Sequence, residues 1–185
     1  VFGGMGFVEE TGAAQHMRDA RVLAIYEGTN GIQANDLLFR KLARDGGTAF
    51  GVYAKEMRET AAALAAKPGD DAKAIASRLN ISLDHLEHAA KHLLHKAKED
   101  IEVAALAAAP FLRLFAVTAG GTQMARAADV ALAGLAARAG ESGFLEAKLI
   151  TARFYAESVL PQTGGLLPVI LSPQRGVLTL PAERF

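Results

Sequence analysis

Glu27 is the residue best placed for chemistry, because it is a single carboxylate among apolar and aromatic neighbours in the run from Ile25 to Gln33. A first helix is expected from about Thr11 to Tyr26 and should stop at Gly28. Burial among the neighbours and the negative end of the helix dipole would both disfavour the ionised carboxylate. A carboxylate in that situation is a useful general base near neutral pH. The alternative is a solvated glutamate at a helix end with no task, and the residues alone leave both readings open.

The residues after Glu27 begin a second helix and could hold a ligand. Asn30, with Gln33 three positions later, has the form of a capping box. The first N–H groups of a helix have no partner within it, so Thr29, Asn30 and Gly31 offer donors to a phosphate or to the edge of a heteroaromatic ring. The pattern therefore places a candidate general base next to a candidate cofactor-binding segment.

Residues 1–44 contain three blocks that resemble the signature of acyl-CoA dehydrogenases. The blocks are Val1-Phe2-Gly3-Gly4-Met5-Gly6-Phe7, Met17-Arg18-Asp19-Ala20-Arg21 and Ile25-Tyr26-Glu27-Gly28-Thr29-Asn30. The rest of the chain resembles the C-terminal extension found in members such as 3-methylmercaptopropionyl-CoA dehydrogenases. That second resemblance rests on Ala109-Pro110-Phe111-Leu112, Gly120-Gly121 and Ala152-Arg153-Phe154-Tyr155-Ala156-Glu157 with Leu160-Pro161.

The resemblance implies a role for each matching residue. Glu27 would remove the α-proton of an acyl-CoA thioester while the β-carbon passes hydride to FAD. Tyr26 and Gly28 would lie against the substrate, and Thr29, Asn30 and Gly31 would line FAD. Arg18 and Asp19 would be structural. The adenosine half of FAD would be contacted across a subunit interface by Val1, Phe2, Gly3 and Gly4.

The family also implies partners and missing parts. An electron-transfer flavoprotein or similar acceptor would reoxidise FAD, and the enzyme would be a homo-oligomer. The chain opens at Val1 within a signature block, so we expect a piece of a longer polypeptide, inactive alone and without bound FAD. The alternative is a non-catalytic structural or oligomerisation module in which Glu27 is incidental. An upstream flavin-binding β-domain would favour the enzyme.

Composition narrows the remaining classes of function. The 20 Lys+Arg and 20 Asp+Glu residues balance, and no basic block favours nucleic acid. No apolar run reaches the roughly 18 residues of a membrane span. The chain has no Cys, which excludes thiol catalysis and disulfides. The default expectation is a cytoplasmic protein without a metal site.

Helical periodicity and the scarcity of alternating β-branched runs predict an all-α fold. A boundary near residue 46 would separate the end of a catalytic helical domain, residues 1–45, from a helical-bundle extension, residues 46–185. The extension would pack between subunits or cover the acyl-CoA entrance. Gly120 and Gly121 should allow close crossing of a neighbouring helix. Further helices are expected at about 30–45, 48–67, 71–108, 110–139 and 143–160, with extended pieces at 166–171 and 177–180.

Four histidines form the second sharpest pattern. His85, His88, His92 and His95 recur at spacings that put them on one stripe of a helix, and such pairs can bind Zn or Ni. Polar neighbours beside an apolar stripe favour the simpler interpretation, in which the imidazoles lie at the half-buried edge of an amphipathic helix.

Overall fold

The computed structural model describes residues 2–184, and every regular element in that range is a helix. The all-α prediction is confirmed. The α-helices are α1 (Ala13–Val22), α2 (Asn30–Asn35), α3 (Thr48–Ala65), α4 (Asp70–Glu99), α5 (Ile101–Leu106), α6 (Ala108–Ala137), α7 (Ser142–Phe154) and α8 (Gln162–Leu171). The shorter segments are the 3-10 turns η1 (Gly3–Gly6), η2 (Glu9–Thr11), η5 (Arg175–Thr179) and η6 (Ala182–Arg184), and the π-helices η3 (Asp36–Ala43) and η4 (Tyr155–Val159). Within residues 2–184, no helix is both long and apolar enough to cross a membrane.

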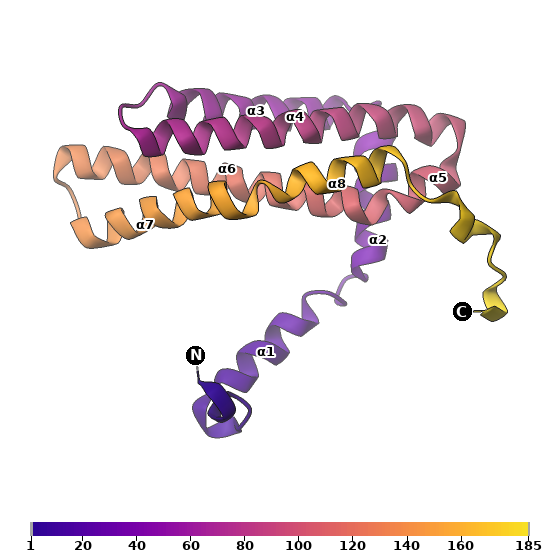
Figure 1. The fold of residues 1–185 in the computed structure, drawn as a ribbon, viewed down its shortest axis with the longest axis horizontal. Coiled ribbons are helices and arrows are strands. Elements are labelled where there is room, and N and C mark those ends of the chain that lie inside the picture. The colour runs from indigo at the N-terminus through magenta and orange to yellow at the C-terminus, as the bar shows by residue number, and fades with distance from the viewer. Residues whose placement is uncertain (1, 185) are drawn as a thin grey trace.

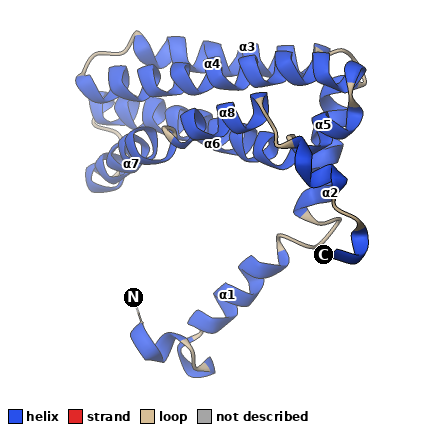
Figure 2. Cartoon of the chain, turned by 45° about the vertical axis from the view of Figure 1, so that its right-hand side comes forward, coloured by secondary structure: helices blue, strands red, loops and turns tan. Residues whose placement is uncertain are grey.

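The chain consists of a bundle and an arm. In the bundle, α3, α4, α6 and the run from α7 to α8 lie lengthwise beside one another, while the arm, residues 2–29, carries α1 away from them (Figures 1 and 2). Helices α2 and η3 connect the two parts. Ala34, Leu38 and Leu42 from these helices are buried in the same core as the bundle. The arm is therefore anchored at its root, and the predicted boundary near residue 46 stays a prediction.

The apolar stripe predicted along α4 forms much of the core, but its helix is shorter than expected. Ile75, Leu79, Leu83, Leu86 and Leu93 are buried, as an amphipathic helix requires.

A single helix over residues 71–108 was expected, and that prediction is wrong. Asp100 adopts extended backbone (φ −154°), and its carboxylate accepts the N–H of Val103 at 3.2 Å, which starts α5. Since the chain turns there, Ile101 leaves the core and is exposed. Asp100 is also ion-paired with Arg175 of the C-terminal segment.

The glycine pair in α6 lies where a neighbouring helix crosses closely, as predicted. A Cβ added to Gly121 would lie 2.6 Å from Leu160 Cδ2, and one added to Gly120 would collide with the Tyr155 hydroxyl. That hydroxyl donates to the carbonyl of Val117 at 3.0 Å. The absence of two side chains thus lets the α7–α8 run lie directly on α6.

The C-terminal segment differs from the sequence-based expectation. Residues 166–171 belong to α8 and residues 177–179 to the 3-10 turn η5, so neither is extended as predicted. Pro168 stands inside α8, where it removes one backbone donor. Burial of Thr163 and Ile170 in the bundle outweighs that local cost.

Asp45 fixes the start of α3, and its replacement should alter the acid stability of the chain. Its carboxylate accepts the N–H groups of Ala49, Gly47 and Thr48 at 2.9, 3.0 and 3.1 Å. The Ala49 N–H, followed by the other two, lowers the pKa of Asp45 below its ordinary value. A lowered folded-state pKa stabilises the fold above the unfolded pKa, about 3.9, and this contribution is lost as pH falls through the folded pKa.

We therefore expect Asp45→Asn to lower the thermal midpoint at pH 7 and to flatten its fall below about pH 4. Thermal unfolding followed by circular dichroism across pH 2–7 measures both effects. Asp19→Asn, at an exposed aspartate of α1, is the matched control. Identical pH profiles for Asp45→Asn and the unmodified chain would contradict this assignment.

Candidate functional site

Glu27 lies in a tight turn between α1 and α2. The first helix ends at Val22 instead of continuing to Tyr26 as predicted, and residues 23–28 form the turn. Glu27 has φ 54°, and Gly28, which follows it, has φ 105°. A left-handed conformation costs a residue with a Cβ roughly 1–2 kcal/mol. Backbone strain of this kind concentrates at functional sites.

Contacts from both sides hold the turn in this conformation. The Gln33 side-chain amide donates to the Glu27 carbonyl at 2.7 Å, and the Asn30 N–H donates to the Ala24 carbonyl at 3.2 Å. A Cβ on Gly28 would lie 3.2 Å from Ile32 Cγ2, so glycine is favoured there by space as well as by φ.

The capping box expected between Asn30 and Gln33 does not form. Thr29 is the N-cap, and its hydroxyl oxygen accepts the Ile32 N–H at 3.5 Å. Gln33 contacts the turn at Glu27 and not the cap, because its side-chain amide donates to the Glu27 carbonyl.

The surroundings of Glu27 are open to solvent. Its side chain is exposed, and so are Ile25, Tyr26 and Ile32, with 55%, 53% and 60% of their surfaces accessible. The predicted burial of the carboxylate among its sequence neighbours is therefore wrong for this chain. The turn lies on the arm, which extends away from the bundle (Figure 1), and the exposed neighbours leave Glu27 accessible to solvent.

The two predicted cofactor-binding groups lie at opposite ends of α1. Thr29, Asn30 and Gly31 are exposed beyond its C-terminal end, and Phe2, Gly3 and Gly4 are exposed before its N-terminal end. Ten helical residues span about 15 Å, so the structure does not bring the groups together. Val1 lies outside the described residues.

Arg18, which the resemblance implies is structural, forms an exposed ion pair within the arm. Its guanidinium binds both carboxylate oxygens of Glu9 at 3.0 Å, which ties α1 to the turn η2. Asp19, next to it, is exposed on α1.

The histidine stripe on α4 divides into two environments. His85 Nδ1 lies 2.9 Å from the Thr163 hydroxyl, which itself donates to the Leu160 carbonyl, so Nδ1 carries the proton. His88, His92 and His95 line a surface hollow with Lys91. Partial burial, followed by the charge of Lys96 and the nearby imidazoles of His88 and His95, lowers the pKa of His92. Within residues 2–184, no three His, Cys, Asp or Glu residues are grouped so as to hold a metal ion.

Comparison with known proteins identifies the family. Residues 53–181, more than half of the chain, match the family model described as acetyl-CoA dehydrogenase C-terminal like. The chain belongs to the acyl-CoA dehydrogenase family. Residues 1–42 match a second model of this family, described as acyl-CoA dehydrogenase, C-terminal domain, and this match contains the whole turn around Glu27.

Relatives within the acyl-CoA dehydrogenase family agree with this assignment. The chain is 45% identical over 160 residues to a 3-methylmercaptopropionyl-CoA dehydrogenase of Ruegeria pomeroyi, covering 86% of the chain and 27% of the relative. It is 30% identical over 202 residues to a broad-specificity linear acyl-CoA dehydrogenase of Mycobacterium tuberculosis, covering 100% and 31%. A short-chain specific acyl-CoA dehydrogenase of Megasphaera elsdenii is 58% identical over 33 residues. The chain thus spans less than a third of the length of the first two relatives.

Proposed function

We propose that this chain supplies the catalytic base for the α,β-dehydrogenation of an acyl-CoA thioester by a complete, FAD-dependent protein. The observation that carries the proposal is the strained backbone at Glu27, which holds a carboxylate at the apex of a turn in a family of dehydrogenases. Strain at a residue with a Cβ supports a functional demand on that side chain.

Glu27 would accept the proton next to the thioester carbonyl, and Tyr26 and Gly28 would lie against the substrate. A base that attacks a weakly acidic C–H group works best away from water. The exposed apolar side chains of Ile25, Tyr26 and Ile32 support this arrangement, because a further part of the protein or a second subunit packed on them would exclude water from Glu27.

FAD, when bound, would accept the hydride from the β-carbon. The exposed Thr29, Asn30 and Gly31 fit one part of such a cofactor. Phe2, Gly3 and Gly4 fit another part, since an added Cβ at either glycine meets no atom within 4 Å and the backbone there is open to a large ligand. Their separation along α1 supports binding of two different flavins, one of them across a subunit interface. A second copy of the protein is therefore one proposed partner. The other, implied by the family, is an electron-transfer flavoprotein or similar acceptor that would reoxidise FAD.

The proposal is tested with the complete protein under anaerobic conditions. Adding a saturated acyl-CoA should bleach the visible absorbance of the flavin, as hydride reaches the cofactor. A flavin that stays oxidised with straight-chain and methylthio-substituted acyl-CoA thioesters alike would contradict the proposed reaction.

We also expect the 185-residue chain alone to bind no FAD, because its two candidate cofactor groups are exposed and far apart. Absorbance of the purified chain after incubation with excess FAD and gel filtration measures the bound flavin. Stoichiometric flavin retained by the chain would be the contrary result.

A further inference from the structure

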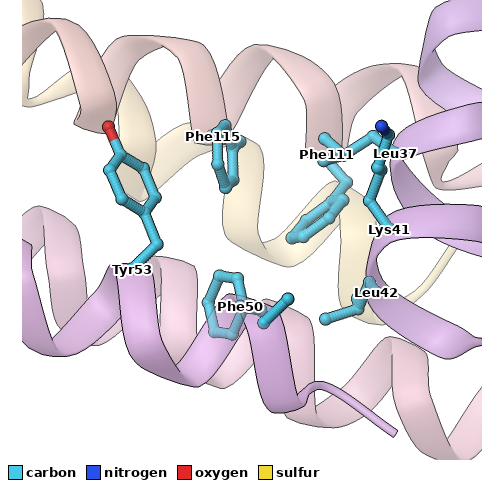
Figure 3. Close-up of a pocket in the computed structure, with 8 residues that line it drawn as sticks. Leu37, Lys41, Leu42, Phe50, Tyr53, Phe111 and Phe115 are labelled. Atoms are coloured by element: carbon cyan, nitrogen blue, oxygen red, sulfur yellow. The ribbon is translucent and has the colours of Figure 1, made fainter. Parts of the chain in front are cut away.

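An apolar pocket lies where the root of the arm meets the bundle, away from the Glu27 turn. Its walls come from η3, from the first turns of α3 and from the start of α6 (Figure 3). The pocket has a volume of about 240 Å³. Sites for drug-sized ligands usually measure about 300–1,000 Å³, so this pocket suits a slimmer molecule.

Aromatic rings give the pocket a firm wall. Phe115 packs against Phe50, Tyr53 and Phe111, with ring centroids 6.5, 5.9 and 6.5 Å apart. Phe111 is fully buried in the core, which anchors this ring cluster. Because the rings already rest on one another, the pocket needs little reorganisation to admit an alkyl chain.

Lys41 supplies charge at one edge of this apolar space. It is the one charged residue among the eight that line the pocket, and in Figure 3 it lies at the opposite side from Tyr53. The Lys41 side chain is 68% exposed, and its ammonium is 4.0 Å from a carboxylate oxygen of Asp36. That distance leaves room for hydrogen bonds from the ammonium to a second anion.

We propose that this pocket binds a small amphiphile, a single medium-length alkyl chain that ends in a carboxylate. The chain would occupy the space between the rings and Leu42, and the carboxylate would meet Lys41 at the edge. None of the pocket residues belongs to the proposed dehydrogenase site, so the proposal is independent of the role of Glu27. A ligand here would touch both η3, the root of the arm, and the bundle.

Isothermal titration of the 185-residue chain with octanoate tests the proposal. We expect one site per chain. Each methylene removed should weaken the affinity roughly fourfold, so hexanoate, which is two methylenes shorter, should bind about sixteenfold more weakly than octanoate. 1-Octanol keeps the tail and lacks the charge. It should bind roughly two- to fivefold more weakly, because an exposed ion pair makes a small contribution.

Two substitutions test separately how the alkyl tail and the carboxylate charge of the ligand contribute to binding. Ala49→Leu places a larger side chain in the pocket and should abolish binding of both ligands, whereas Ala63→Leu, at an exposed position on the same helix, should not. Lys41→Gln should reduce octanoate affinity to that of 1-octanol and leave 1-octanol unchanged. Lys55→Gln removes an exposed lysine of α3 and is the charge control.

Thermal unfolding of each variant verifies that it is folded. The proposal is overturned by any of three results with folded protein: no octanoate binding, binding that survives Ala49→Leu, or equal octanoate affinity before and after Lys41→Gln.

Discussion

Replacing Glu27 by Gln in the complete protein should reduce acyl-CoA dehydrogenation by about 10²–10⁴-fold while FAD stays bound, since general-base catalysis contributes about that much. The amide has nearly the same shape as the carboxylate but cannot accept the proton. The turn should survive, because Gln33 bonds to the main-chain carbonyl of residue 27 and not to its side chain. The rate of flavin reduction under anaerobic stopped flow measures the loss, and the flavin spectrum reports retention of the cofactor.

Glu10→Gln is the control for this experiment, because Glu10 is an exposed glutamate on the same arm, in η2. It should leave the rate of flavin reduction unchanged. Turnover like that of the unmodified protein in Glu27→Gln would remove the assignment of the base.

Gly121→Val should destabilise the bundle by about 1–3 kcal/mol, the usual cost of overfilling a packed core. The new Cβ would lie 2.6 Å from Leu160 Cδ2, and Leu160 is itself buried, so the α7–α8 run must move away from α6. For a chain of this length, each kcal/mol shifts the thermal midpoint by about 2–4 °C. Urea unfolding gives the free energy, and calorimetry gives the midpoint.

Gly51→Ala provides a matched control with the opposite sign. Gly51 lies inside α3 in open space, with no atom within 4 Å of an added Cβ. Alanine there should stabilise the chain by about 0.8–1.0 kcal/mol through helix propensity alone. An unfolding free energy of Gly121→Val equal to that of the unmodified chain would show that α6 and the α7–α8 run are not closely packed.

The local sequence pattern was sufficient to predict the structure where hydrophobic periodicity and helix-breaking residues indicated the same element. The stripe of α4, the fresh start near Pro110 and the tight crossing at Gly120 and Gly121 are all visible in the sequence. The stripe requires an apolar face and the glycine pair requires missing side chains, and the core uses both features.

Local pattern failed where long-range contacts decide the backbone. Asp100 lies in a charged run that favours continued helix, yet it caps α5 and pairs with Arg175, which is 75 residues away. Pro161, Gly164, Gly165 and Pro168 suggested an extended tail, but burial of Ile170 makes that segment helical. The pairing of Asp100 with Arg175 and the burial of Ile170 have no short-range signal, whereas the cap that Asp100 makes to Val103 spans only three residues and is typical of aspartate.

At the candidate site, the chemistry that the sequence indicates stays a prediction, whereas the geometry that it predicted differs from the structure in part. Glu27 was identified through its motif, but its left-handed backbone and the contact from Gln33 were not predicted. The signal that could have found the turn was the pairing of Glu27 with Gly28, since glycine often occupies such conformations. Water exclusion could not be derived, because these 185 residues leave the carboxylate exposed.

The backbone at position 27 sets resistance to unfolding against the proposed role of Glu27 as a base. Glycine tolerates the left-handed region without the penalty of roughly 1–2 kcal/mol that a Cβ incurs, so removing the whole side chain should make the folded chain harder to melt. Selection for heat resistance alone would be expected to favour glycine at this position, as it would at Arg138, where φ is 52°. Engineering for thermal stability should therefore keep the Glu27 turn unchanged and stabilise the bundle instead.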